Sequence, residues 1–95
     1  MQKTVVVTGG TRGIGASISR ALNKQGWQVA AVYHANEEGA KAFQQDTPIA
    51  VFKWDVGDFS ACQDGLAGIE KDLGPISALV NNAGITQDAM LVLML

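Results

Sequence analysis

Short runs of β-branched and other apolar residues alternate along this chain with longer segments of mixed polarity. Four runs are candidate strands, at residues 4–8, 28–33, 49–54 and 78–81. The segments between them have the length and composition of amphipathic helices. Strands that alternate with such helices run parallel, because each connection crosses back over the sheet in a right-handed sense. The pattern predicts an α/β fold with a doubly wound parallel sheet, in the strand order 3-2-1-4.

Two of the intervening helices have clear limits. The first is predicted to begin near Gly13 and to end before Gly26. Its apolar residues recur at steps of four and should face the sheet: Ile14, Ile18 and Leu22. The third helix should follow Asp58 as its N-cap and end at Gly74. Its apolar stripe consists of Cys62, Leu66, Ile69 and Leu73.

The arrangement of these elements leaves apolar surface to be covered. The first two helices should cover one face of the sheet and only the third the other face. The fourth strand is expected at an open edge, and the uncharged segment 89–95 adds further apolar residues. On these grounds the chain is expected to self-associate.

Composition limits the possible partners. With 95 residues, 47% hydrophobic and 17% charged, the chain should form one packed domain. A net charge of -2 with scattered Lys and Arg favours neither nucleic acid nor an anionic membrane surface. The longest apolar run has seven residues, whereas a membrane span needs roughly 20. We therefore expect no nucleic-acid partner and no membrane partner.

Cysteine and histidine usage bears on location and on metals. Cys62 is the single cysteine and His34 the single histidine, far from each other in sequence, so neither an internal disulfide nor a metal site is expected. The first apolar run is too short for the core of an export signal. A cytoplasmic location is therefore expected.

The segment TGGTRGIG at 8–15 lies where the first strand ends and the first helix begins. In a doubly wound sheet this is where a pyrophosphate binds. Gly9 would permit the tight turn, Gly13 the approach of the backbone to the phosphates, and Gly15 the close packing of the helix. The N–H groups of the helix N-terminus provide positive potential for the anion. The alternative, a glycine-rich turn without a ligand, is disfavoured by three glycines at this spacing.

The string TGGTRGIG, together with NNAG at 81–84, resembles the paired signatures of the short-chain dehydrogenase/reductase family. The glycine spacing follows the GxxxGxG pattern of that family rather than GxGxxG. The resemblance covers residues 3–90 and implies that residues 1–95 are the N-terminal dinucleotide-binding part of one Rossmann-like domain. It also implies that Ile14 contacts the cofactor, that Asn82 and Ala83 lie near the adenosine ribose, and that Gly84 and Ile85 lie toward the nicotinamide.

The choice between NAD and NADP depends on the end of the second strand, where a carboxylate would bind the ribose 2′-hydroxyl of NAD. The strand ends instead in YHAN at 33–36, and the two following glutamates are typical of a helix first turn behind an Asn36 N-cap. Arg12 resembles the residue that pairs with the 2′-phosphate in NADPH-preferring members, with Asn36 and His34 adding contacts. We therefore expect NADP(H). The alternative for Arg12 is a solvated loop charge, and for His34 a surface position is favoured over a cofactor contact.

Two further contacts follow from the same resemblance. Asp55 and Val56 match an Asp-Val pair that contacts the adenine ring after the third strand. The alternative for Asp55 is a residue that precedes a helix, a role that Asp58 fits better. Asp88 matches a residue at the mouth of the substrate pocket, and an exposed loop aspartate is an equal alternative.

The acid catalyst of the family is a tyrosine whose lysine partner follows four residues later. Tyr33 is the only tyrosine here, and position 37 is glutamate. No residue of the chain is therefore assigned to catalysis. The catalytic Tyr, Lys, Ser and Asn are expected beyond Leu95, and this chain alone is expected to be inactive.

Within the family, the sequence is most similar to the acetoacetyl-CoA reductases of polyhydroxybutyrate synthesis. This resemblance implies NADPH-dependent reduction of a 3-oxoacyl thioester, with an acyl-CoA substrate, by a homotetrameric parent enzyme. Two alternatives stay open: a 3-oxoacyl-carrier-protein reductase of fatty acid synthesis, and a non-catalytic dinucleotide-binding regulator.

Overall fold

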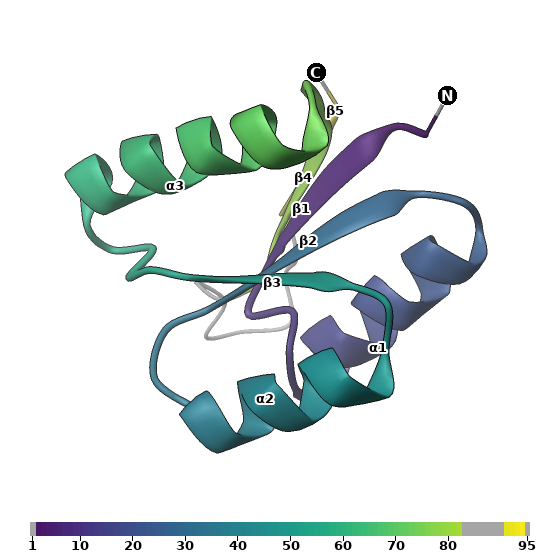
Figure 1. Ribbon diagram of the computed structural model, residues 1–95. Coiled ribbons are helices and arrows are strands. Elements are labelled where there is room, and N and C mark those ends of the chain that lie inside the picture. The colour runs from purple at the N-terminus through teal and green to yellow at the C-terminus, as the bar shows by residue number, and fades with distance from the viewer. Residues whose placement is uncertain (1, 83–90, 95) are drawn as a thin grey trace.

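The computed structural model describes residues 2–82 and 91–94, which form one five-stranded sheet with three helices. Along the chain the elements are β1 (Thr4–Thr8), α1 (Gly13–Lys24), β2 (Gln28–Tyr33), α2 (Glu37–Asp46), β3 (Ala50–Lys53), α3 (Phe59–Leu73), β4 (Ile76–Asn81) and β5 (Leu91–Met94). The sheet order is β3-β2-β1-β4-β5, and the first four strands are parallel (Figure 1). The predicted fold class and the order of these four strands are confirmed.

The fifth strand corrects one expectation. β5 runs antiparallel to β4, with Leu93 opposite Leu79 and Val92 opposite Val80. The expectation that β4 is an open edge is therefore wrong, because the backbone of the apolar tail pairs with it. An exposed strand edge carries unpaired N–H and C=O groups, and a returning segment satisfies them. An open edge at β4 therefore gives no ground for self-association.

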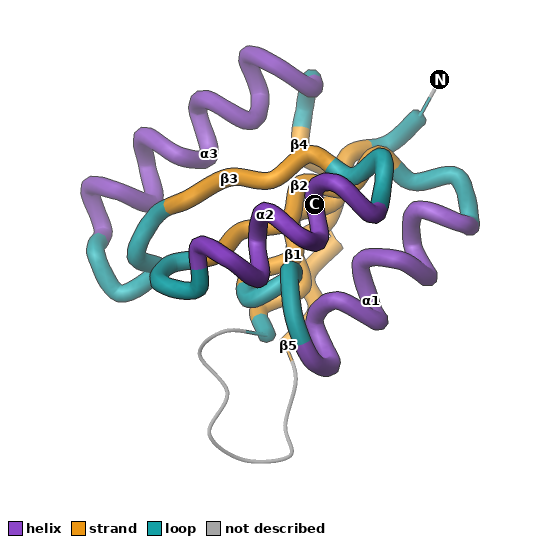
Figure 2. Tube along the Cα trace, turned by 60° about the horizontal axis from the view of Figure 1, so that its bottom comes forward, coloured by secondary structure: helices purple, strands orange, loops and turns teal. Residues whose placement is uncertain are grey.

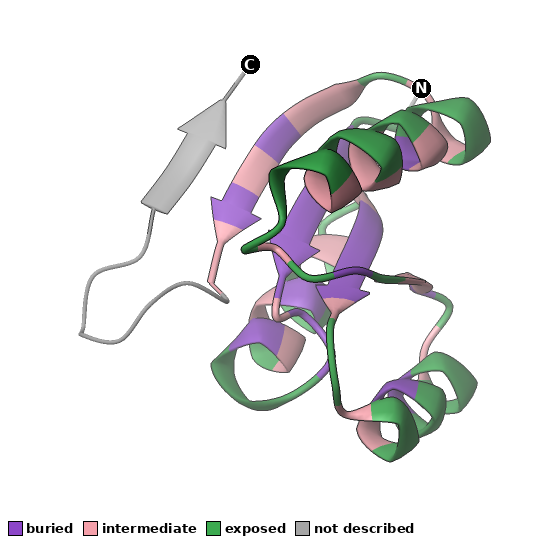
Figure 3. Cartoon of the chain, turned by 90° about the vertical axis from the view of Figure 1, so that its left-hand side faces the viewer, coloured by how far each residue is buried: buried purple, intermediate pink, exposed green. Residues whose placement is uncertain are grey.

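Helices cover the two faces of the sheet as predicted, with α1 and α2 on one face and α3 on the other (Figures 1 and 2). Val5 and Val7 of β1 pack with Phe43 of α2 in one apolar cluster. Val6 of the same strand packs with Ile69 of α3 in the other cluster. The buried residues therefore concentrate on the central strands, which are covered on both sides (Figure 3).

The first helix meets its prediction only in part. Ile18 and Leu22 pack against the sheet, but Ile14 is 69% exposed. Ile14 belongs to the first turn of α1, directly after the loop that follows the end of β1. The expectation that Ile14 faces the sheet is therefore wrong.

Side-chain caps begin the other two helices at the predicted residues. The Asn36 side chain accepts a hydrogen bond from the Gly39 N–H at 3.1 Å, and the Asp58 side chain accepts one from the Ala61 N–H at 3.1 Å. Such a cap typically contributes about 1 kcal/mol to stability.

Among the described residues, no helix is long and apolar enough to cross a membrane.

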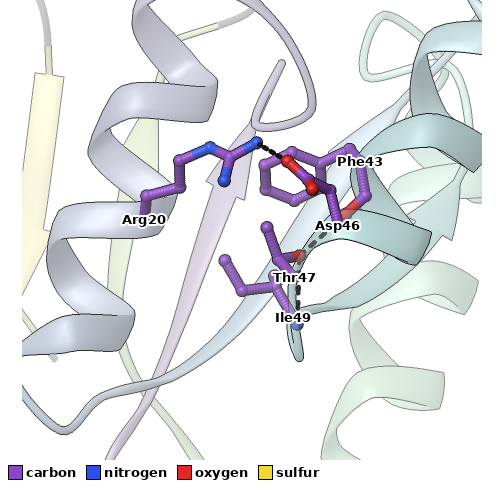
Figure 4. Close-up of polar contacts among 5 residues, drawn as sticks. All are labelled: Arg20, Phe43, Asp46, Thr47 and Ile49. Carbon is purple, nitrogen blue, oxygen red and sulfur yellow. Dashed lines mark hydrogen bonds and ion pairs between the residues drawn. The ribbon is translucent and has the colours of Figure 1, made fainter.

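A polar contact joins α1 to the end of α2 (Figure 4). The Arg20 guanidinium donates to the Asp46 carboxylate at 3.1 Å and lies 5.2 Å from the centre of the Phe43 ring. Thr47 then donates its hydroxyl to the Phe43 carbonyl at 2.9 Å. Because the ion pair is exposed to solvent, it contributes at most about 1 kcal/mol. Its role is to hold the two helices together on their shared face.

Candidate cofactor-binding site

A cleft of about 680 Å³ lies at the carboxyl ends of β1, β2 and β4. Its wall consists of Gly9, Thr11, Arg12, Gly13, Tyr33, His34, Ala35, Asn36 and Asn82. The chain adds β2 and β3 on one side of β1 and then crosses to add β4 on the other side. Open α/β sheets bind their ligands at such a switch point. The volume is within the usual range for small-molecule sites.

A second hollow, of about 440 Å³, lies between α1 and α2. Its wall includes the paired Arg20 and Asp46 side chains, whose charges already compensate each other. The cleft at the strand ends instead has a helix N-terminus in its wall. It is therefore the better candidate for binding an anion.

The glycine loop has the backbone geometry that its spacing predicts. Gly13 has a φ of +56°, in the left-handed region that favours glycine. A Cβ atom added to Gly15 would lie 1.9 Å from the Gly9 carbonyl oxygen and 2.7 Å from the Asn82 side-chain nitrogen. The absence of a side chain at Gly15 therefore lets the start of α1 lie directly against the loop and the end of β4.

A polar network holds the loop between neighbouring strands. The Thr8 hydroxyl accepts a hydrogen bond from the Asn82 N–H at 2.9 Å, and the Asn82 side chain donates to the Gly9 carbonyl at 3.3 Å. On the other side, the buried Ser19 hydroxyl donates to the Gly10 carbonyl at 3.0 Å. The role of Ser19, which lies six residues after Gly13 in α1, was not predicted. A serine among the inward-facing apolar positions of α1 could have indicated a buried hydrogen bond.

The predicted cofactor residues fall into three groups. Five belong to the wall of the cleft: Gly9, Arg12, Gly13, Asn36 and Asn82. Four are described but lie outside that wall: Ile14, Gly15, Asp55 and Val56. The other predicted positions, Ala83, Gly84, Ile85 and the substrate residue Asp88, lie outside the described residues.

Arg12 and Asn36 both belong to the wall of the cleft and carry donor groups. Arg12 is the N-cap residue of α1, with an extended backbone at φ −151° and ψ 164° and an exposed side chain. Its guanidinium forms no ion pair with any other residue in the described part of the chain. The Asn36 side-chain oxygen caps α2, which leaves the NH₂ group of that amide for a ligand. Both residues can donate to a phosphate.

Asp55 and Val56 lie in the turn between β3 and α3. One carboxylate oxygen of Asp55 accepts from the Gly57 N–H at 2.8 Å, which forms an Asx turn. Val56 is partly buried against the apolar cluster that contains Val6 and Ile69. Its carbonyl accepts a hydrogen bond from the Cys62 thiol at 3.3 Å. The sequence DVGD at 55–58 indicates this turn, because aspartate and glycine are typical turn residues. The predicted adenine contact of these residues stays a prediction.

A cluster that the sequence analysis did not predict lies beside the cleft. The Tyr33 hydroxyl donates to the Glu37 carboxylate at 3.0 Å, and Lys53 pairs with the same carboxylate. Partial desolvation and the hydrogen bond to Glu37 raise the pKa of Tyr33. The hydrogen bonds from Lys53 and then Tyr33 lower the pKa of Glu37. A carboxylate partner thus makes Tyr33 a weaker acid, whereas a lysine partner would make it a stronger one.

Comparison with known proteins places these features in a family. The profile of the short chain dehydrogenase family matches residues 3–94. Acetoacetyl-CoA reductase of Shinella zoogloeoides is 58% identical over 90 residues, covering 95% of this chain and 37% of that protein. The human 3-oxoacyl-[acyl-carrier-protein] reductase is 37% identical over 94 residues, covering 97% of this chain and 39% of that protein. The chain therefore spans well under half the length of either relative.

A solved structure has a similar fold. The blue fluorescent protein from a metagenomic library, in complex with NADPH, superposes with a TM-score of 0.81 at 34% identity. The match covers 90% of this chain and 37% of that protein. The sheet order, the glycine loop at the switch point and the profile match together show that this chain belongs to the short-chain dehydrogenase family.

Proposed function

We propose that this chain is the cofactor-binding, N-terminal part of a cytoplasmic, homotetrameric reductase. In this proposal the complete reductase converts acetoacetyl-CoA to 3-hydroxybutyryl-CoA with NADPH, as a step of polyhydroxybutyrate synthesis. The observation that carries the proposal is the 58% identity to an acetoacetyl-CoA reductase across 95% of the chain. The human carrier-protein reductase, which represents the alternative substrate class, is 37% identical.

The residues of the cleft fit a dinucleotide with a 2′-phosphate. The N-terminus of α1 and the loop at Gly13 present backbone N–H groups to the pyrophosphate. The Arg12 guanidinium and the Asn36 amide supply donors for the 2′-phosphate, and a guanidinium matches phosphate oxygens in two parallel hydrogen bonds. When bound, the nicotinamide supplies the hydride. The described residues of this chain hold and orient the cofactor.

We expect wild-type protein to bind NADPH more tightly than NADH, and Arg12→Ala to reduce that preference by about 1–3 kcal/mol. This is the size of a charge-assisted hydrogen bond. Calorimetric titration of the chain with each cofactor measures the two dissociation constants. Arg20→Ala is a matched control, since it removes an arginine of α1 that pairs with Asp46 instead of lining the cleft. A preference that Arg12→Ala leaves intact would contradict the assigned role.

We also expect the complete reductase to have a higher kcat/KM for acetoacetyl-CoA than for the acetoacetyl group on an acyl carrier protein. The two substrates present the same carbonyl, so a direct competition compares only the recognition of the carrier. A higher value for the carrier-bound substrate would replace the proposed function with the carrier-protein alternative.

A further inference from the structure

Tyr33, Glu37 and Lys53 meet beside the part of the cleft that the end of β2 forms. Tyr33 belongs to the wall, and Glu37 directly follows the wall residue Asn36. One carboxylate oxygen of Glu37 accepts from the Tyr33 hydroxyl, and the other pairs with the Lys53 ammonium. Tyr33 and Lys53 are direct partners across the parallel strands β2 and β3. The Glu37 carboxylate is thus held at the end of β2, beside the part of the cleft wall that Tyr33 and Asn36 form.

An unpaired carboxylate at this position would oppose NADPH. The 2′-phosphate of NADPH carries a charge of roughly −1.5 to −2 at neutral pH, as phosphate monoesters do. Repulsion between two unit charges about 4 Å apart in water corresponds to about a fivefold loss of affinity, and the loss is smaller at longer distances. NADH has a hydroxyl at the same place and is affected much less. Whether the negative charge of Glu37 is neutralised therefore affects the ratio of NADPH to NADH affinity.

We infer that Lys53 is a specificity-determining residue for NADPH, which acts by neutralising Glu37 without contacting the cofactor. This inference rests on the proposed use of NADPH. The hydrogen bonds from Lys53 and Tyr33 hold the pKa of Glu37 below its usual value, so the carboxylate is ionised at neutral pH. Lys41 adds only a weaker, longer-range attraction to Glu37. Lys53 supplies the main compensating charge.

The first test is Lys53→Met, which keeps most of the side-chain volume and removes the charge. Calorimetric titration of the chain should show a weaker affinity for NADPH, by at most about fivefold, and a smaller change in the affinity for NADH. Lys24→Met is the control, because it removes the same charge from an exposed residue at the last turn of α1. Lys24 lies about 18 Å along the helix from its N-terminus, so the cofactor ratio should stay unchanged.

The double variant Lys53→Met/Glu37→Gln distinguishes compensation from direct binding. Removing both charges should restore the wild-type ratio of NADPH to NADH affinity. If Lys53 contacted the phosphate itself, the double variant would bind NADPH as weakly as the single one, which would overturn the inference. Equal weakening of both cofactors in Lys53→Met would also overturn it. A wild-type chain without any preference for NADPH would instead overturn the proposed function, and this inference with it.

Discussion

Gly15→Ala should abolish NADPH binding at concentrations that saturate the wild-type chain. The new Cβ atom would lie 1.9 Å from the Gly9 carbonyl oxygen, which belongs to the backbone of the loop that frames the cleft. Relief of this clash requires α1 and the loop to separate, which moves the N–H groups away from the phosphates. Overpacking typically costs about 1–3 kcal/mol, and a backbone clash this close belongs at the upper end, which corresponds to roughly a hundredfold in affinity. Calorimetric titration with NADPH measures the loss.

The same substitution elsewhere in the fold provides the control. Gly68 lies in α3, and a Cβ atom added there would have no neighbour within 4 Å. Gly68→Ala should therefore leave NADPH binding unchanged and raise the free energy of unfolding by about 0.5–1 kcal/mol, because alanine favours the helix. Denaturant unfolding of both variants separates loss of the site from loss of the fold. Wild-type affinity in Gly15→Ala would refute the close approach of α1 to the loop.

The 95-residue chain should bind NADPH yet reduce no acetoacetyl-CoA. Carbonyl reduction leaves an oxyanion that an acid must protonate, and general acids typically contribute 10²–10⁴-fold to rate. Tyr33 is the only tyrosine, and its hydroxyl donates to Glu37, which together with partial desolvation raises its pKa. It is therefore poorly suited to donate a proton. The absorbance of NADPH in the presence of acetoacetyl-CoA reports any turnover.

Two controls make that negative result informative. The complete reductase under the same conditions should consume NADPH, which shows that the assay works. Tyr33→Phe removes the single tyrosine hydroxyl of the 95-residue chain, and its NADPH binding is measured alongside its activity. Turnover by the chain that disappears in Tyr33→Phe would identify Tyr33 as an acid and contradict the prediction.

Periodicity and local turn signals were sufficient for most of the fold. β1 and β2 have the predicted bounds: β1 lies between Lys3 and Gly9, and β2 follows the turn at Gly26 and ends before His34. β4 begins at Ile76, two residues earlier than predicted, directly after the break at Gly74 and Pro75. β5 was missed because a short apolar run has no period of its own, and its pairing depends on the free edge of a distant strand.

The candidate site was predictable where it depends on local backbone. The glycine loop follows from spacing alone, since turns and helix starts are set by a few consecutive residues. The cluster of Tyr33, Glu37 and Lys53 could not be predicted in the same way. It requires the register between β2 and β3, which places Lys53 beside Tyr33 although twenty positions separate them in sequence. Sequence patterns specify the strands more readily than their register.

The hydrogen bond from the Asn82 N–H to the Thr8 hydroxyl joins residues 74 positions apart. Contacts of such long sequence separation form late, because the chain between them must be ordered first. During synthesis the residues of the glycine loop therefore leave the ribosome well before those of the opposite wall of the cleft. A cofactor that needs both walls binds only chains in which β4 has docked, and by mass action it favours that docking. The supply of dinucleotide in the cell would thus influence how many newly made chains complete their sheet.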